Sequence, residues 1–286
     1  MKPLLGATDL TVIANTADDD EFWGLLVCPD VDAVIYRLAG VFNEEAGYGL
    51  KDDSFHVLDA LSRVGEPVWF RIGDSDFGTH ILRAELLRQG GTLTEASLEL
   101  CRRFGVAASV LPMSDQPVRT RFATDRGELS FQEYFVRERL APKLHSIRFA
   151  GIESARPTQA VLDALADADL VIIGPSNPLI SVRPVLKLVG ARLPRERTVA
   201  VTPIVGGAAL KGPTVEMLKA VGPPPDPVEV ARLYREVAAT FVLDSRDGGL
   251  APAIERLGYR TLVVDTVMKE GGGKLAREIL RASGHV

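Results

Sequence analysis

The sequence is poor in the residues that build disulfide frameworks, metal clusters and membrane spans. Only two cysteines, Cys28 and Cys101, occur in 286 residues, and the four histidines are scattered without metal-ligand spacing. No apolar run approaches the ~20 residues that a transmembrane helix needs. The chain does not open with a basic segment followed by an apolar one, as secretory signals do. These absences exclude a disulfide scaffold and predict a cytoplasmic protein without a membrane partner.

The chain also lacks any concentration of basic charge. Its 33 Lys and Arg residues form no basic run and are outnumbered by 38 Asp and Glu residues, which gives a net charge of −5. Nucleic acid is therefore not an expected partner. What the chain does have is an apolar content of 46%, which is ample for a core. Its length allows one large α/β domain or two small ones.

Short apolar runs alternate with helical periodicity along most of the chain. The runs predict buried strands at residues 10–14, 68–72, 106–113, 170–173, 199–204 and 261–265, a hairpin from strands 118–124 and 128–136, and a helix over 228–241 followed by an extended 242–244. Thr92 and Glu95 have capping-box spacing. Strands separated by helical lengths favour a mainly parallel sheet. We therefore predict a Rossmann-like, three-layer α/β fold in a single domain, residues 1–286, with a small helical and hairpin insertion around 85–140.

The segment with the strongest chemical signal begins at the strand over residues 10–14. Three carboxylates, Asp18, Asp19 and Asp20, follow the strand, and Asp30 and Asp32 precede the next helical pattern. In open α/β sheets, ligands bind outside the carboxyl ends of the strands. Since Mg²⁺ prefers carboxylates together with phosphate oxygens, the segment predicts a metal–phosphate site. The alternative is a solvated turn at Asp18 to Asp20, with Asp30 serving as a helix N-cap.

Three further loops are expected at the same edge of the sheet. Residues 73–80 contain Asp74 and His80, which is either a catalytic base or a structural donor. Residues 174–178 are stiffened by two prolines and could position Ser176 and Asn177 for a ligand, although a plain structural turn is the alternative. Residues 205–212 contain Gly206 and Lys211, whose surroundings could offer backbone N–H groups to a phosphate, but the P-loop spacing is absent.

These blocks together resemble the 2-phospho-L-lactate transferase family of coenzyme F420 biosynthesis. In the family's order, the matching residues are 15–19, 29–32, 36–40, 71–76 with Thr79, His80 and Arg83, then 111–115, 131–133, 174–178 with Ser181, 203–204 and 211–213. They span almost the whole chain. One departure is the start, because the family has a strand and a Gly-rich phosphate loop before the strand at 10–14, and nine residues cannot supply them. We expect the true start to lie upstream, since residues 4–6 resemble the end of the missing helix.

The resemblance implies a magnesium-dependent transfer. A guanosine-diphosphate-activated donor, such as lactyl-2-diphospho-5′-guanosine or its enolpyruvyl analogue, gives its phospho-acid to the 5′-hydroxyl of the deazaflavin Fo and releases GMP. The implied roles are catalysis for Asp18, Asp19 and Asp74, magnesium binding for Asp18, Asp19 and Asp30, Fo binding for Asp32 and Arg71, and nucleotide binding for Ser176, Asn177, Gly206 and Lys211. A homodimer is also expected.

Two other classes of protein remain open. One is a nucleotide-sugar-binding regulatory protein of the related fold, which performs no transfer. The other is an inactive, truncated paralogue that acts as a binding partner. Asp32, Arg71 and the acidic residues at 74–76 favour the transferase over the regulatory protein, and an in-frame Gly-rich segment upstream of Met1 would distinguish it from the truncated paralogue.

Overall fold

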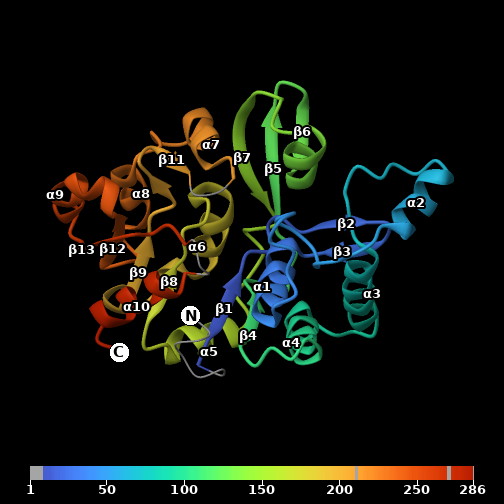
Figure 1. Cartoon of the computed structure of the whole chain (residues 1–286), viewed down its shortest axis with the longest axis horizontal. Coiled ribbons are helices and arrows are strands. Elements are labelled where there is room, and N and C mark those ends of the chain that lie inside the picture. Colours follow the sequence, from blue (N-terminus) through green and yellow to red (C-terminus); the bar gives the residue numbers. More distant parts are fainter. Residues whose placement is uncertain (1–8, 210–211, 269–271, 286) are drawn as a thin grey trace. The chain divides into compact units, whose positions relative to one another are not determined.

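The computed structural model describes residues 9–209, 212–268 and 272–285. Two compact units divide the described chain, a first unit up to Val161 and a second unit from Leu162 onward (Figure 1). The expectation of one domain with an insertion around 85–140 stays a prediction, and the residues 4–6 singled out above lie outside the described residues.

The first unit contains short strands and the longest helices of the chain. Its strands are β1 Thr11–Ala14, β2 Asp20–Phe22, β3 Leu25–Val27, β4 Ser109–Pro112, β5 Arg119–Thr124, β6 Gly127–Ser130 and β7 Leu144–Ala150. Its helices are α1 Pro29–Ala39, α2 His56–Arg63, α3 Asp74–Arg88 and α4 Leu93–Arg103, with a π-helix at Glu133–Arg137 and α5 Gln159–Asp167 at the junction of the two units.

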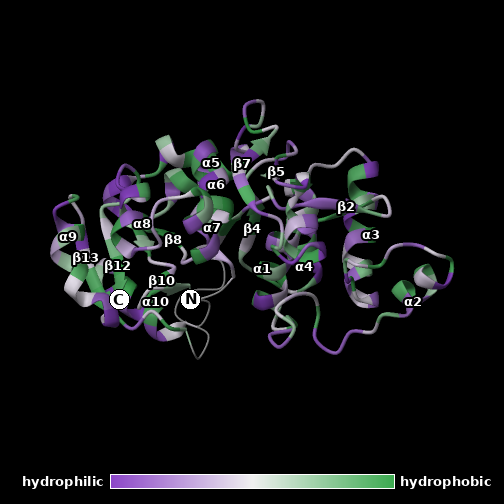
Figure 2. Ribbon diagram, turned by 90° about the horizontal axis from the view of Figure 1, so that it is seen from above, coloured by the Kyte–Doolittle hydropathy of each residue, from purple (hydrophilic) through white to green (hydrophobic). Residues whose placement is uncertain are grey.

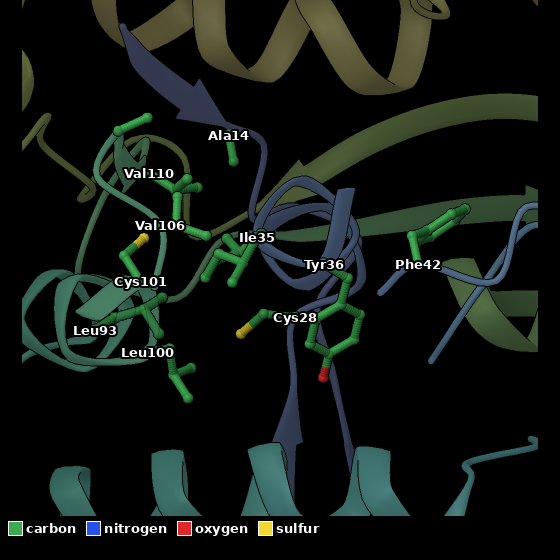
Figure 3. Close-up of a cluster of buried hydrophobic side chains, with 12 residues drawn as sticks. Ala14, Cys28, Ile35, Tyr36, Phe42, Leu93, Leu100, Cys101, Val106 and Val110 are labelled. Carbon is green, nitrogen blue, oxygen red and sulfur yellow. The ribbon is translucent and has the colours of Figure 1, made fainter. Parts of the chain in front are cut away.

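The strand expected at residues 10–14 is β1, and it pairs in parallel with β4. Helices α1 and α4 pack against this pair, and Figure 3 shows Ile35, Leu100 and Val110 within their shared apolar cluster. A separate antiparallel sheet has the order β6-β5-β7, and β2 and β3 form a small hairpin. The core of the first unit therefore fixes where β1 ends and where α1 begins, which is where the acidic segment lies.

The ends of the helices follow from local sequence. Pro29 occupies the first turn of α1, where its missing N–H costs nothing, and Gly40 ends the helix at a left-handed φ of 79°. The capping box expected at Thr92 and Glu95 is confirmed at the start of α4. The Glu95 N–H donates to Thr92 Oγ1 over 3.1 Å, and the Thr92 N–H donates to Glu95 Oε2 over 2.7 Å.

The second unit is built on a four-stranded parallel sheet of order β13-β12-β9-β8. Its strands are β8 Val171–Ile173, β9 Thr198–Val201, β10 Ile204–Val205, β11 Ala208–Ala209, β12 Thr240–Asp244 and β13 Arg260–Val264. Its helices are α6 Arg183–Val189, α7 Thr214–Val221, α8 Pro227–Tyr234, α9 Ala251–Glu255 and α10 Gly273–Ala282, with a π-helix at Pro178–Val182 and 3₁₀ turns at Gly190–Arg192, Arg195–Arg197 and Ser245–Leu250.

Strands β12 and β13 are largely hydrophobic (Figure 2), as expected for parallel strands that are covered by helices. Leu275 and Ile279 of α10 pack against Val199, Val201 and Val242 of the sheet. The predicted α/β class with parallel sheets is confirmed. Among the described residues, no helix is long and apolar enough to cross a membrane.

The strand predicted at residues 68–72 is wrong. This segment has no strand partner among the described residues, and α3 begins directly after it at Asp74, so residues 74–80 are helical and not a loop. The segment is held by side chains. Phe70 stacks on Phe22 with ring centroids 4.0 Å apart, and Ile72 is buried. A short apolar run can bury its side chains without joining a β-ladder.

Two further boundaries differ from the prediction. The second arm of the hairpin ends at Ser130, and residues 133–137 form the π-helix instead of continuing the strand. The helix expected over 228–241 ends at Tyr234, because Thr240 and Phe241 pair with Val199 and Ala200 of β9. The helix boundary is thus set by strand pairing that is distant in sequence, whereas the hairpin arm ends where Ser130 and Glu133 exchange local hydrogen bonds.

Candidate active site

The loop after β1 connects the end of that strand to the start of α1 through Asn15. The Asn15 Nδ2 group donates to Asp18 Oδ2 over 3.0 Å and to Asp30 Oδ2 over 2.9 Å. Its Oδ1 atom accepts the Ala17 N–H over 3.0 Å, which closes the turn. One buried amide thus holds two carboxylates side by side, although they are far apart in the sequence.

Strand β5 and the segment before the π-helix hold Asp18 from the other side. Thr120 Oγ1 donates to Asp18 Oδ1 over 2.8 Å, and Gln132 Nε2 donates to the Asp18 carbonyl oxygen over 3.0 Å. Asp18 is only 5% exposed. The acidic loop is therefore part of the packed interior of the first unit.

These positions decide between the two interpretations of the acidic segment. Asp18 and Asp19 are buried, so the solvated-turn alternative is wrong for both of them. Asp30 is the second residue of α1, whose N-cap position is Cys28 without a side-chain cap bond, so the N-cap alternative is wrong as well. The solvated-turn and N-cap interpretations are therefore excluded for these residues. Their catalytic and metal-binding roles stay predictions.

Burial and mutual repulsion control the charge of this cluster. Burial raises the pKa of Asp18 well above its ordinary value, and the neighbouring Asp30 carboxylate raises it further, against hydrogen bonds from Thr120 and Asn15 that lower it. Burial likewise raises the pKa of Asp30. A bound cation would stabilise the charged form of carboxylates that are crowded in this way.

Asp19 differs from its neighbours in its hydrogen-bond donors. No N–H or O–H group of the described residues donates to its two buried side-chain oxygens, and Thr16 Oγ1 is likewise buried without a partner there. Burial raises the pKa of Asp19 well above its ordinary value, while a hydrogen bond from the Cys28 thiol and the charges of the Arg119 and Arg83 guanidinium groups act to lower it. A buried carboxylate whose donor is a weak thiol keeps a large desolvation cost, which a cation or a further donor would offset.

A cavity of about 330 Å³ lies beside Asp19 within the first unit. Thr16, Asp19 and Arg119 contribute polar groups to its lining, and Leu26, Leu87 and Pro117 contribute apolar surface. Its size is at the lower end of the ~300–1,000 Å³ range of small-molecule sites. The acidic loop therefore borders a space that a small organic group can enter.

The donor set suits a magnesium ion that shares its coordination with a substrate. Asp18, Asp19 and Asp30 would supply the carboxylate oxygens, and neither oxygen of Asp19 accepts a bond from an N–H or O–H group of the described residues. Among the described residues, no group of three or more Asp, Glu, His or Cys side chains is arranged to hold a metal by itself. Mg²⁺ is commonly bound by one or two carboxylates plus phosphate oxygens and water, and the residues present fit that mode.

A second polar network is buried next to this cluster and is centred on Arg83 of α3. Arg83 is fully buried and donates to Asp32, to the Leu26 carbonyl oxygen over 3.1 Å and to His80 Nδ1 over 3.2 Å. Burial acts to lower the pKa of Arg83, but Asp32, Cys28 and Asp19 together outweigh burial and raise it. Asp32 Oδ2 is buried, has no hydrogen-bond partner among the described residues and lies 3.7 Å from His80 Nδ1.

His80 belongs to the same network and is 1% exposed. Burial lowers its pKa to about 4, so the ring is neutral at pH 7. Because Arg83 can only donate, Nδ1 must accept and the ring proton lies on Nε2, which is 3.5 Å from Asp76 Oδ1. Between the two interpretations of His80, this geometry favours the structural one.

Asp76 and Tyr36 complete the network. The Tyr36 hydroxyl donates to Asp76 Oδ1 over 2.6 Å and is 2.7 Å from Thr79 Oγ1. Burial raises the pKa of Asp76 to about 7, with further increases from the Asp32 and Asp53 carboxylates. The network joins α1 to α3 and fixes the side chain of Asp32, whose role in Fo binding stays a prediction.

Asp74 and Arg71 lie in different surroundings. Asp74 accepts hydrogen bonds from Ser54 Oγ over 2.6 Å and from the His56 and Val57 N–H groups over 2.9 Å each, and these bonds lower its pKa. No hydrogen bond or ion pair within the described part of the chain joins Asp74 to Asp18 or Asp19. Arg71 is exposed, with its guanidinium carbon 4.1 Å above the centre of the Phe55 ring.

The predicted nucleotide residues lie in the second unit. Ser176 is exposed in the loop after β8, and Asn177 Oδ1 accepts the Leu179 N–H over 2.9 Å, which caps the following π-helix. Gly206 lies in the tight turn between β10 and β11, and its N–H already donates to Asp247 Oδ2 over 2.8 Å. Lys211 lies outside the described residues. The nucleotide-binding roles of all four stay predictions.

Sequence reasoning did not select several residues that the structure places at the site. Thr16 and Thr120 were not singled out, although Thr120 belongs to a strand whose alternate residues point inward and so could have been expected to face the core. Arg83 was noted only as part of a matching block, and Arg119 was not noted. A fully buried arginine leaves no signal in a single sequence.

The first unit therefore has a buried carboxylate cluster at the carboxyl end of its first strand, next to a cavity that could admit a small organic group, in an α/β protein. The family model described as 2-phospho-L-lactate transferase CofD matches residues 3–252. The chain belongs to this family.

Curated relatives support this assignment over almost the whole chain. A 2-phospho-L-lactate transferase of Methanosarcina barkeri is 38% identical over 270 residues, which cover 94% of this chain and 87% of the relative. One from Methanopyrus kandleri is 39% identical over 281 residues, covering 96% and 89%. A phosphoenolpyruvate transferase of Streptomyces griseus is 37% identical over 290 residues, covering 97% and 91%.

Among solved structures, a UPF0052-family protein from Bacillus halodurans is similar in fold. Its TM-score is 0.56 at 16% identity, and the match covers 94% of this chain and 90% of that protein. At this identity the likeness shows the fold alone.

Proposed function

We propose that this protein is a transferase of coenzyme F420 biosynthesis. It moves a phospho-three-carbon-acid group, 2-phospholactyl or enolpyruvyl phosphate, from a guanosine-diphosphate-activated donor to the 5′-hydroxyl of the deazaflavin Fo. The observation that carries the proposal is the nearly full-length similarity to relatives named 2-phospho-L-lactate transferase and phosphoenolpyruvate transferase. The buried carboxylate cluster beside a cavity supports it independently.

The reaction forms one P–O bond and breaks another. The acceptor hydroxyl oxygen attacks the phosphorus atom that carries the acid, the bond from that phosphorus to the bridging oxygen of the diphosphate breaks, and GMP leaves with the bridging oxygen. The hydroxyl proton passes to the surrounding solvent or buffer. Such a transfer depends on positioning and charge neutralisation more than on covalent help from the enzyme.

The residues of the first unit divide this work. Asp18, Asp19 and Asp30 form the acidic cluster that would hold magnesium, which when bound supplies charge neutralisation on the diphosphate. Asn15 and Thr120 fix the orientation of Asp18, so the cluster is ordered before substrate arrives. Asp32, with one oxygen held by Arg83 and the other unpartnered among the described residues, is proposed to contact Fo together with Arg71.

The second unit is proposed to bind the nucleotide. Four parallel strands end at one edge of its sheet, and the loop that contains Ser176 and Asn177 follows the carboxyl end of β8. Ligands of open α/β sheets bind at such an edge. Ser176, Asn177, Gly206 and Lys211 are the proposed contacts. Asp74 is kept as a proposed catalytic residue, and a homodimer as the proposed assembly.

The test is a reconstituted assay with Fo, Mg²⁺ and each synthetic donor, carrying lactate, enolpyruvate or glycerate. The expected products are GMP and an Fo conjugate whose mass identifies the acid. The Asp18→Asn variant is the control, because its side chain has the same shape but not the same charge. Binding of nucleotide without turnover of any donor would favour a regulatory protein of the same fold over a transferase.

A further inference from the structure

Helix α2 and the loops on either side of it form an exposed arm of the first unit, residues 43–67. Figure 1 and Figure 2 both show α2 at the outer edge of that unit. Within the arm only Leu58 is buried. Three large apolar side chains are exposed there, Tyr48 at 46%, Val57 at 41% and Val64 at 77%. The arm therefore presents apolar surface to the outside of the molecule, which is typical of a contact with another protein surface.

The protein holds this short helix in a fixed orientation. A helix of eight residues is not stable by itself in water, so α2 depends on contacts with the rest of the first unit. Leu58 anchors the helix in the same apolar cluster as Ile72. The Asp74 carboxylate accepts the His56 and Val57 N–H groups over 2.9 Å each, which satisfies two donors of the first turn. The outward face of α2 is therefore ordered before any partner binds.

The outward face of α2 carries an apolar stripe with a charged flank. Val57, Ala60 and Val64 are spaced three and four residues apart, so they lie on one side of the helix, and all three are exposed. Asp59 and Arg63, four residues apart, lie together on one flank of this stripe. Neither of these two side chains has a hydrogen bond or an ion pair within the described part of the chain. Such a combination is typical of a helix that pairs with another helix.

The pattern on α2 is complementary to itself. When two copies of a helix pack antiparallel about a two-fold axis, the start of one helix meets the end of the other. Val57 of one copy then lies near Val64 of the second copy, and Asp59 of one lies near Arg63 of the second. Each contact occurs twice. The small Ala60 side chain between them allows the two helices to approach closely.

We propose that α2 is the homodimer contact of this protein, packed antiparallel against α2 of a second copy with Val57, Ala60 and Val64 at the centre. Reciprocal ion pairs between Asp59 and Arg63 lie at its edge. The inference rests on the proposed function only in taking the assembly to be a homodimer. Eight helical residues span ~12 Å, less than an interface of ~800 Å² per partner requires, so the expected dimer is weak, with a Kd of about 10 µM.

Sedimentation equilibrium of the 286-residue chain, from about 1 µM to about 300 µM, measures this dimer directly. Val64→Lys places two charges in the apolar centre and should raise the Kd at least about 10-fold, equivalent to ~1.4 kcal/mol. The position is 77% exposed, so the fold of the single chain does not depend on it. Ile81→Lys is the matched control, because Ile81 is 56% exposed on α3, outside the arm, and its Kd should stay within about 2-fold of wild type.

Exchange of charge between chains tests the antiparallel arrangement. Asp59→Lys alone and Arg63→Glu alone each place like charges together twice, so each should raise its own Kd about 10-fold. An equimolar mixture of the two variants restores both opposite-charge contacts and should form a heterodimer with a Kd within about 2-fold of wild type. Damage to α2 within one chain would not be repaired by adding another chain. Urea titrations establish that each variant unfolds at the wild-type midpoint.

Three results would overturn the inference. A chain that is monomeric at about 300 µM would remove it together with the proposed homodimer, but not the proposed transfer. A dimer that Val64→Lys leaves intact would show that the contact lies elsewhere. Two weakened variants that fail to associate when mixed would exclude the antiparallel pairing. Conversely, a dimer with these properties and no turnover of any donor would remove the proposed transfer and support this contact.

Discussion

Replacing Arg83 by methionine tests how strongly the buried ion pair with Asp32 supports the first unit. Arg83 is 0% exposed and donates to the Asp32 carboxylate, to the Leu26 carbonyl oxygen and to His80 Nδ1. Methionine fills much of the same space but donates no hydrogen bond. The substitution therefore leaves a carboxylate, a carbonyl oxygen and an imidazole nitrogen without their partner in a site that water does not reach.

The size of the effect follows from the burial of both partners. The side chain of Asp32 is 6% exposed and that of Arg83 is 0% exposed, so neither charge can be rehydrated without opening the packing. Removal of one member of a buried ion pair typically costs ~3–5 kcal/mol, and we expect Arg83→Met to lower the free energy of unfolding by that amount. The double variant Asp32→Leu with Arg83→Met removes both charges of this pair and should recover at least about half of the loss.

The assay is urea denaturation followed by circular dichroism for the wild type, the two single variants and the double variant. Arg88→Met is the control, since Arg88 lies on the same helix in an exposed pair with Glu85, and its unfolding midpoint should match the wild type. Two results would refute the reasoning. One is an Arg83→Met protein within ~1 kcal/mol of wild type, and the other is single losses that simply add in the double variant.

Three other predictions concern the acidic cluster, Asp76 and the capping box of α4. Asp18→Asn and Asp30→Asn should each lower the rate ~10²–10³-fold and raise the Mg²⁺ requirement, and full wild-type activity in excess chelator would contradict this. Burial raises the pKa of Asp76 to about 7, so the folded state holds a proton that the unfolded state loses above about pH 4, and this stabilisation falls as pH rises from about 4 to about 7. Thermal melts should therefore show Asp76→Asn gaining stability relative to wild type between about pH 4 and about pH 7 and no further gain above it, and a constant difference across that window would count against that pKa. Thr92→Ala breaks the capping box with Glu95 and should cost ~1 kcal/mol in denaturant titrations, whereas an unchanged midpoint would mean that tertiary packing alone holds α4.

Local chemistry was sufficient for much of the fold. The β-branched run at residues 11–14 is β1, Pro29 and Gly40 bracket α1, and the capping box starts α4 where its spacing predicts. These features depend on residues within a few positions of one another, so one sequence contains all the necessary information. The alternation of such segments was likewise enough to indicate an α/β protein, and the ordered motif blocks were enough to indicate the family.

Tertiary structure decided everything that depends on distant partners. The apolar run at 68–72 was expected in a sheet, but a strand needs a free edge of another strand to pair with. Here Phe70 stacks on Phe22 instead. The sequence showed three neighbouring carboxylates but could not show which of them is buried or which has hydrogen-bond donors. Thr120, 102 residues away, donates to Asp18, while no N–H or O–H group of the described residues donates to Asp19, which has the Cys28 thiol beside it. The free-energy cost of a buried charge depends on which residues surround it, and folding brings those residues together from separate parts of the chain.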